Sequence, residues 1–229
     1  MELKYITYSE LLRSKLALLG FRRKGKSDFL REVNGFVQSI GYCHSSPIPH
    51  FRNYYIMIGL TYPKLENLAM ELGIYTAGAW GITIGQLTPK NNFQQWLVSN
   101  SATEEDVRDT VIDMVNLIET YAVPFLNKYS DIHEVLFELE EGKRFLPRHY
   151  DLPLIYYTLG ENENAISYIK QELIRKESRV RRSHEGNPFE LKNNDIRETP
   201  LDREYNEYKE FAKNLIARIK QQEQTFKQT

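Results

Sequence analysis

Cysteine is almost absent from this 229-residue chain, in which Cys43 is the only thiol. One cysteine cannot form an intramolecular disulfide, and it cannot supply a thiolate-rich zinc or iron–sulfur site. Long apolar runs are absent too, because Lys4, Arg13 and Lys15 interrupt the apolar residues near the N-terminus. We therefore expect no signal peptide, no membrane span and no membrane partner, and we expect the protein in the cytoplasm.

Recognisable catalytic and cofactor motifs are also missing. The sequence at His133 begins like the helix motif of zinc proteases, but Phe137 occupies the position of the second histidine. Cys43 and His44 are adjacent, and neighbours in a strand point to opposite faces, so they cannot form a thiol–base dyad. The glycines in residues 73–85 fit neither a dinucleotide-binding nor a phosphate-loop pattern. We expect no catalytic residue, no metal and no cofactor.

The composition that remains is ordinary for a soluble, folded protein, with 41% hydrophobic and 27% charged residues. The formal net charge is −1, but its distribution is uneven. Basic side chains are in excess over residues 1–60, and acidic side chains are in excess over residues 61–160. This asymmetry indicates a surface that steers a charged partner, or solvated faces that simply differ.

The first part of the chain has the pattern of a helix followed by a sheet. Apolar residues at helical spacing predict an amphipathic helix over residues 8–19. Asn34 and Gly35 favour a tight hairpin turn, so we expect antiparallel strands on both sides of them. Further strands are predicted at 53–61 and at 81–85. Together these segments predict a mostly antiparallel sheet of about four to five strands after an N-terminal helix.

From Thr103 onward the pattern becomes helical. Thr103 and Asp106 resemble a capping box, and an apolar stripe follows them. Pro124 is expected to end or kink this helix, and the helical register then continues up to Gly142. Residues 151–180 read as a helix pair. We interpret residues 1–130 as an α+β domain, followed by a helical C-terminal region at 131–229 that packs on it.

The end of the chain holds a predicted loop and a long helix. Residues 183–200 lack apolar periodicity and contain two prolines, so they are predicted to form a mobile loop. The last helix, residues 201–226, shows a heptad seam that docks on its own chain or pairs with a second copy. Tyr205, Ala212 and Gln222 make the seam imperfect, which favours docking within the chain. A homodimer through this helix is the alternative.

Two basic runs and one aromatic segment are the candidate interaction sites. The basic runs begin at Arg22 and at Arg175, and together they offer a phosphate-binding face. A sequence pI of about 6.5 argues against a dedicated nucleic-acid protein. The segment 147–157 combines arginine and tyrosine, which are enriched in interface hot spots. The candidate interaction residues are Arg22, Arg23, Lys24, Lys26, Arg148, Tyr150, Arg179, Arg181 and Arg182.

Two stretches carry a resemblance to a known family. Residues 18–25 (LLGFRRKG) with Phe29-Leu30-Arg31, and later residues 55–63 (YIMIGLTYP), are similar to a bacterial family known only as domain of unknown function 4304. The similarity covers about residues 5–130. The family pattern places a glutamine before the serine that is Ser45 here, and Cys43 stands in its place. The resemblance implies a small α+β domain of a bacterial cytoplasm and brings no activity with it.

These observations favour a non-enzymatic protein-binding module, of an immunity or scaffold type, whose protein partner is unidentified. The alternatives are a nucleic-acid-associated protein that uses the basic runs, and a hydrolase with an unrecognised site. The hydrolase alternative requires His44, His50, His133 or His149 to meet Cys43 or carboxylates in a pocket. Enzymatic activity therefore stays uncertain, and the sequence favours none.

Overall fold

The computed structural model describes residues 2–46, 48–142, 148–185 and 199–226. The chain divides into two compact units. The first, Met1–Lys64 with Gly78–Leu146, contains the sheet and is called the sheet unit here. The second, Leu65–Ala77 with Pro147–Thr229, is the helical unit. The expected division at residue 130 falls between two helices of the sheet unit, and the packing of the C-terminal region on that unit stays a prediction.

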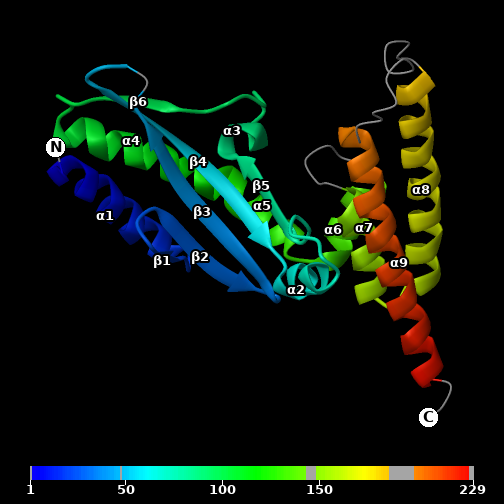
Figure 1. Ribbon diagram of the computed structural model, residues 1–229. Coiled ribbons are helices and arrows are strands. Elements are labelled where there is room, and N and C mark those ends of the chain that lie inside the picture. Colours follow the sequence, from blue (N-terminus) through cyan, green and yellow to red (C-terminus); the bar gives the residue numbers. More distant parts are fainter. Residues whose placement is uncertain (1, 47, 143–147, 186–198, 227–229) are drawn as a thin grey trace. The chain divides into compact units, whose positions relative to one another are not determined.

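The sheet is antiparallel throughout and has six strands, in the order β1-β2-β3-β4-β5, with β6 paired to β4 (Figure 1). The predicted α+β class is therefore confirmed. Two of the strands are short and were not predicted, β1 with three residues and β6 with four. The strands are β1 (Arg22–Lys24), β2 (Asp28–Val33), β3 (Phe36–Ser45), β4 (Phe51–Thr61), β5 (Ala79–Thr83) and β6 (Trp96–Ser99).

The β2–β3 hairpin forms where the sequence predicts it. Val33 pairs with Phe36, which leaves Asn34 and Gly35 as the two-residue turn. Their φ angles are 52° and 80°. Positive φ at both positions matches the right-handed twist of the strands, and asparagine and glycine adopt it at low cost. This turn sets the register of β2 against β3 and so decides which side chains share a face.

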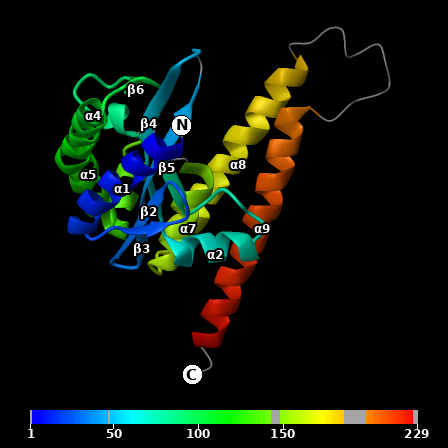
Figure 2. The ribbon, with the colours of Figure 1, turned by 90° about the vertical axis from the view of Figure 1, so that its left-hand side faces the viewer.

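Helices cover one face of the sheet. In both views α1 (Glu2–Leu18), α4 (Glu104–Leu117) and α5 (Val123–Tyr129) lie on the same side of the strands (Figures 1 and 2). The core between them is apolar, with fully buried residues such as Leu16, Ile40 and Ile56. The remaining helices of this unit are α3 (Ile84–Leu87), the π-helix η1 (Ile118–Ala122) and α6 (Ile132–Glu140).

The sequence predicts unbroken helical register up to Gly142, and the structure corrects this. The chain breaks between α5 and α6, where Ser130 has φ −82° and ψ 23°. Asp131 is extended and its carboxylate accepts a hydrogen bond of 2.9 Å from the His133 amide, so it caps a new helix. The helical periodicity therefore continues in the sequence although the helix itself ends and restarts.

The helical unit contains α7 (Arg148–Thr158), α8 (Asn162–Glu185), α9 (Pro200–Phe226) and most of α2 (Pro63–Glu71). Helices α8 and α9 run side by side in both views (Figures 1 and 2). Seam residues Tyr208, Ala212, Leu215 and Ile219 of α9 are buried, so the seam packs within its own chain. None of the described helices is long and apolar enough to cross a membrane.

The predicted loop at 183–200 lies mostly outside the described residues. Its first residues, 183–185, belong to α8 instead, and Pro200 begins α9. His184 Nε2 lies 3.0 Å from Asp202 Oδ1, which joins the end of α8 to the start of α9. Asp202 also accepts hydrogen bonds from the amide and hydroxyl of Thr199, at 2.8 and 2.7 Å, which form an N-terminal cap.

Candidate functional site

The register of the sheet sorts its side chains into two faces. Directly paired residues of antiparallel strands point to the same side, and neighbours along a strand alternate. Ser39 pairs with Gly59, and Gly59 pairs with Gly81. On β3, Gln38, Ile40 and Tyr42 are buried towards the helices. Ser39, Gly59 and Gly81 therefore lie on the opposite face, which we call the outer face.

The outer face carries no charge over the three strands β3, β4 and β5. The solvent face of an antiparallel sheet is ordinarily polar, because it alternates with the core face along each strand. Here it is built from small, hydroxyl and apolar residues, all half-buried or exposed. We call these positions the uncharged surface. They are Val37, Ser39, Gly41, Cys43, Tyr55, Met57, Gly59, Thr61, Ala79, Gly81 and Thr83.

An apolar patch borders this surface at one end. Phe93, from the loop after α3, packs on Tyr55 with ring centroids 5.4 Å apart. The Phe93 side chain is still 53% exposed, and Leu97 of β6 is 52% exposed. Leu97 pairs with Asn53 of β4, two residues before Tyr55, so it lies on the same outer face. Large exposed apolar side chains that gather in this way are typical of interaction surfaces.

Beyond the uncharged surface, towards the opposite edge of the sheet, the outer face carries charges of both signs. Asp28 and Glu32 of β2 pair with Gly41 and Val37, and the basic residues lie one strand further out, on β1. Arg22 pairs with Leu30, and Leu30 pairs with Ser39, so Arg22 lies in the same row as Gly59. Lys24 lies in the next row, opposite Asp28. Within the described ranges, neither Arg22 nor Lys24 forms an ion pair. Two cations without an ion-pair partner among the described residues therefore lie at the β1 edge of the outer face, with Asp28 and Glu32 between them and the uncharged surface.

The other predicted residues of the first basic run have local roles. Arg23 points to the helix side, where its Nη1 lies 3.2 Å from Glu10 of α1. Its Nε and Nη2 donate to the carbonyls of Gly25 and Lys26 in the β1–β2 turn. A cavity of about 510 Å³ opens at this edge, lined in part by Arg22, Lys24 and Glu32. The four-residue run is thus divided between the two faces.

The second basic run lies in α8, and its members have local contacts within the helical unit. Arg181 lies 3.8 Å from Glu177, and Arg182 Nε donates to the Ser178 carbonyl. Arg179 acts on Glu204, whose pKa is lowered first by a hydrogen bond from Lys176 and also by the Arg179 charge. The prediction that the two basic runs act together concerns residues of separate units and stays untested.

The aromatic candidate is part of the helical core. The Tyr150 ring meets the Phe211 ring edge-on, with centroids 5.0 Å apart, and it also lies 5.5 Å from Tyr208. Burial raises the pKa of the Tyr150 hydroxyl to about 12. Tyr150 therefore stabilises the packing of α7 on α9. The side chain of Arg148 lies outside the described residues.

Cys43 and His44 point away from each other, as the strand geometry predicts. Cys43 lies on the outer face, where it hydrogen-bonds with the Tyr55 hydroxyl and so raises the pKa of Tyr55. His44 lies on the helix face, with its ring 6.1 Å from that of Tyr54. In the described part of the chain, no group of three or more histidine, cysteine or acidic side chains is arranged to hold a metal ion.

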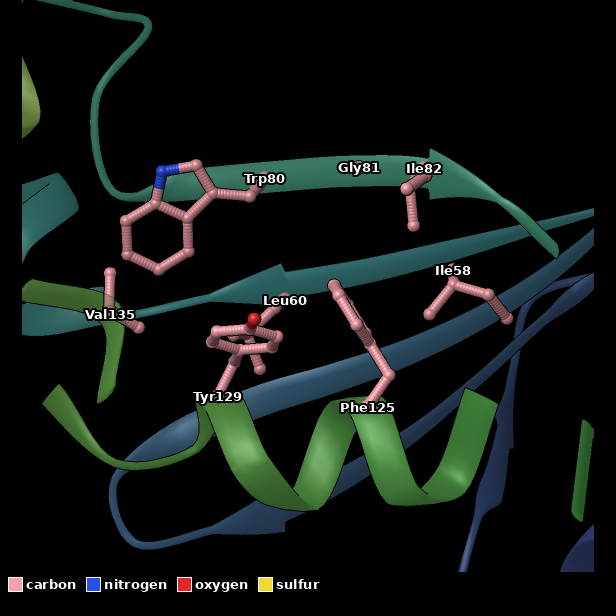
Figure 3. Close-up of a pocket in the computed structure, with 8 residues that line it drawn as sticks. All are labelled: Ile58, Leu60, Trp80, Gly81, Ile82, Phe125, Tyr129 and Val135. Atoms are coloured by element: carbon pink, nitrogen blue, oxygen red, sulfur yellow. The ribbon is translucent and has the colours of Figure 1, made fainter. Parts of the chain in front are cut away.

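An apolar gap in the core is too small to hold a substrate. Phe125 and Tyr129 rise from α5 towards Leu60 and Trp80 of the sheet, and the gap lies between them (Figure 3). Its volume of about 10 Å³ is close to that of one water-sized sphere. No polar group lines the gap in a way that would fix a ligand, so it is a packing defect of the core.

Gln38 joins the sheet to α5 through a buried polar network. Its Oε1 accepts two hydrogen bonds from Arg31, and its Nε2 donates to the Ser130 hydroxyl at 2.7 Å. Arg31 also donates to Asn127 Oδ1 at 2.7 Å and to the Leu19 carbonyl at 2.8 Å. Burial lowers the pKa of this guanidinium. Arg31, one of the residues that resemble the family, is therefore a structural cation.

The comparisons with known proteins agree with this architecture. The family described as "Domain of unknown function (DUF4304)" matches residues 12–128, which span the sheet, α4 and α5. The match covers just over half of the chain, and the protein belongs to this family. The chain has no significant match among curated proteins or among solved structures.

Proposed function

We propose that this protein is a non-enzymatic protein-binding module, and that its partner packs on the uncharged surface of the sheet. The observation that carries the proposal is the absence of charge on the outer face of three successive strands. A partner that packs on Met57, Gly59 and Gly81 buries no charged residue of β3, β4 or β5, and so avoids the desolvation penalty of several kcal/mol that burying an unpaired ion incurs. Asp28 of β2, whose carboxylate lies beside Gly41, marks the limit of this area.

The borders of the surface indicate the chemistry of the partner. The half-buried ring of Tyr55 and the exposed side chains of Phe93 and Leu97 favour apolar and aromatic side chains at one end. Arg22 and Lys24 on the edge strand β1, beyond Asp28 and Glu32 of β2, favour acidic side chains at that edge, because neither cation has an ion-pair partner among the described residues. We therefore commit to a protein partner that presents an apolar patch with acidic residues to one side of it.

Site-specific photo-crosslinking tests this proposal directly. A benzophenone amino acid replaces Met57, at the centre of the surface, and the full-length protein is irradiated inside its source cells. The matched control carries the same group at Ile112, an exposed residue on α4 in the helix layer. We expect a protein adduct from position 57 that is absent from position 112 and is lost when Arg22 and Lys24 are both changed to Glu.

Other outcomes overturn the proposal. No adduct from position 57, or the same adducts from both positions, would show that no partner occupies this face. An adduct that disappears on nuclease treatment would identify a nucleic acid as the ligand instead. Hydrolysis of a broad ester, phosphate and nucleotide panel by the purified protein would contradict the non-enzymatic part of the proposal.

A further inference from the structure

The two ends of the strand order differ in length and in charge. At one end, β1 has three residues and all of them are cationic, Arg22, Arg23 and Lys24. Short strands and charged side chains at the edge of a sheet prevent other chains from pairing with it. At the other end, β5 (Ala79–Thr83) has five residues and contains neither a charge nor a proline. The protection that β1 carries is therefore missing from β5.

The hydrogen-bond pattern shows which backbone groups of β5 point away from β4. The register of the two strands places Tyr62 opposite Gly78, and the Tyr62 amide donates to the Gly78 carbonyl at 2.7 Å. Along an antiparallel strand, residues that exchange hydrogen bonds with the opposite residue alternate with residues that do not. Every second residue from Gly78 therefore bonds to β4. The residues between them direct their amides and carbonyls to the open side, and they are Ala79, Gly81 and Thr83.

Two of these three residues form what we call the free edge, Ala79 and Gly81. The Thr83 amide donates to Gln86 Oε1 at 3.0 Å, which closes the edge at the start of α3. Among the described residues, the outward amides and carbonyls of Ala79 and Gly81 have no hydrogen-bond partner. Both residues are exposed. The free edge therefore offers two donors and two acceptors in the spacing of a β-ladder.

We propose that the free edge binds an extended strand of the partner protein, which adds a further strand to the sheet beside β5. The inference rests on the protein-binding function proposed above, and it names the way in which the partner binds. An extended backbone presents its own amides and carbonyls at the spacing of Ala79 and Gly81. Strand addition of this kind gains affinity from main-chain hydrogen bonds and specificity from the alternating side chains.

The side chains around the free edge indicate the chemistry of that strand. Trp80 and Ile82 point to the side of the sheet where Phe125 rises from α5 (Figure 3). Ala79 and Gly81 lie on the outer face and are small and uncharged. The side chains of an added strand alternate between these two sides. The strand therefore presents apolar residues on the helix side and uncharged residues on the outer face, so the uncharged surface continues onto the partner.

A second copy of the chain fits the free edge less well than a different protein. Two β5 strands related by a two-fold axis at Gly81 would place Ala79 of one copy opposite Thr83 of the other. Hydrogen bonding at that position requires the Thr83 amide, which already donates to Gln86. The pair at the axis alone would keep both of its hydrogen bonds. We therefore commit to a strand or extended segment of a different protein.

Proline at position 81 tests the added strand. Gly81→Pro replaces one outward amide with a ring, and sheets tolerate proline on an edge strand where the amide faces solvent. Gly81→Ala is the matched control, because it keeps the amide and its Cβ meets nothing closer than the Ile58 carbonyl at 3.8 Å. Both full-length variants carry the benzophenone amino acid at position 57 and are irradiated in the source cells. We expect the yield of protein adduct to fall about tenfold in Gly81→Pro and to stay within about twofold in Gly81→Ala.

Amide hydrogen exchange gives a second readout, which needs no variant. The full-length protein is saturated with the purified protein that position 57 traps, and exchange of the Ala79 and Gly81 amides is followed by NMR. A hydrogen bond to the added strand protects an amide that is open to solvent in the free protein. We expect both amides to exchange at least about tenfold more slowly in the complex.

The outcomes separate this inference from the proposed function. Either equal adduct yields in Gly81→Pro and Gly81→Ala or unchanged exchange of both amides would overturn the added strand, and the partner would then bind the outer face alone. No adduct from position 57 in the wild-type background would overturn both the inference and the proposed function. An adduct of twice the mass of the chain would identify a second copy and contradict the commitment to a different protein.

Discussion

The Arg31 guanidinium and the Gln38 side chain meet inside the sheet unit, where Nε and Nη2 of Arg31 donate to Gln38 Oε1 at 2.9 and 2.6 Å. Gln38 is completely buried, although its inward neighbours along the strand, Phe36 and Ile40, are apolar. Its amide then donates to Ser130 and to the Leu126 carbonyl. One glutamine therefore connects β2, β3 and α5.

Replacement of this glutamine is expected to destabilise the protein. Gln38→Leu leaves two donors of a partly buried cation without an acceptor, and each buried polar group left unpaired costs about 1–3 kcal/mol. We expect the free energy of unfolding to fall by about 2–4 kcal/mol in urea denaturation. Ser39→Ala, one residue along the same strand on the outer face, is the control and should change it by less than about 0.5 kcal/mol. Equal changes in the free energy of unfolding in the two variants would show that the Gln38 network does not stabilise the fold.

The apolar gap between α5 and the sheet predicts whether a substitution at its wall stabilises or destabilises the protein. Val135→Ile adds one methylene group to the wall of the gap, so we expect a gain of about 0.5 kcal/mol in the free energy of unfolding. Val135→Ala enlarges the gap, and we expect it to lower the free energy of unfolding by about 2 kcal/mol. Thermal or urea unfolding measures both. A loss larger than about 1 kcal/mol in Val135→Ile would show that the gap is closed and the core is overpacked.

Removal of the buried Tyr208 hydroxyl is expected not to lower the stability of the protein. The hydroxyl has no partner among the described residues, and burial raises the pKa of this group because the charged phenolate is disfavoured. Tyr208→Phe therefore removes an unpaired polar atom, and stability should stay the same or rise by up to about 1 kcal/mol. A clear loss of stability, measured by urea unfolding, would reveal a hydrogen bond to that oxygen.

The cap at the start of α9 predicts a dependence on pH. Hydrogen bonds, first from His184 and then from Thr199, lower the pKa of Asp202 to about 2 from an ordinary value of 3.8. Because the folded pKa is the lower one, the ionised carboxylate contributes stability that is complete above 3.8 and is lost as the pH falls towards 2. The difference in thermal stability between wild type and Asp202→Ala should be about 1 kcal/mol near neutral pH and shrink below pH 3.8.

Thr225→Ala gives the matched control for that series. Its hydroxyl donates to the Gln221 carbonyl near the end of the same helix, and it does not titrate. The difference between wild type and this variant should be independent of pH. A pH-independent difference for Asp202→Ala as well would mean that the Asp202 carboxylate is not responsible.

Local signals in the sequence predicted part of the fold. Asn34-Gly35 predicted the hairpin, because its turn requires positive φ at two successive positions and few residue pairs adopt that conformation. Thr103 and Asp106 predicted the start of α4, and both reciprocal hydrogen bonds of the capping box are present. The short strands β1 and β6 and the nine-residue helix α2 were missed, because each is too short to show a period and depends on its tertiary neighbours.

The candidate sites were less predictable, and for different reasons. For the uncharged surface, the sequence shows an alternation along β3 between buried residues and the uncharged residues Val37, Ser39, Gly41 and Cys43. The surface forms only when β4 and β5 pair beside β3 and place their own uncharged residues on the same face. The ion pair of Lys176 with Glu204 joins residues of two helices, and no spacing rule connects them. The basic runs were visible as charge, whereas their division between faces and partners depends on the register.

The affinity of the protein for the partner trapped through position 57 tests the central claim most directly. Gly81→Glu puts a long charged side chain on the uncharged surface, on β5 beside Gly59, and the strand tolerates it because a Cβ at this position meets nothing closer than the Ile58 carbonyl at 3.8 Å. Glu105→Lys, on an exposed position of α4, is the control. We predict that Gly81→Glu weakens binding by about a hundredfold in calorimetry while Glu105→Lys leaves it unchanged. Unchanged affinity in Gly81→Glu would contradict the account.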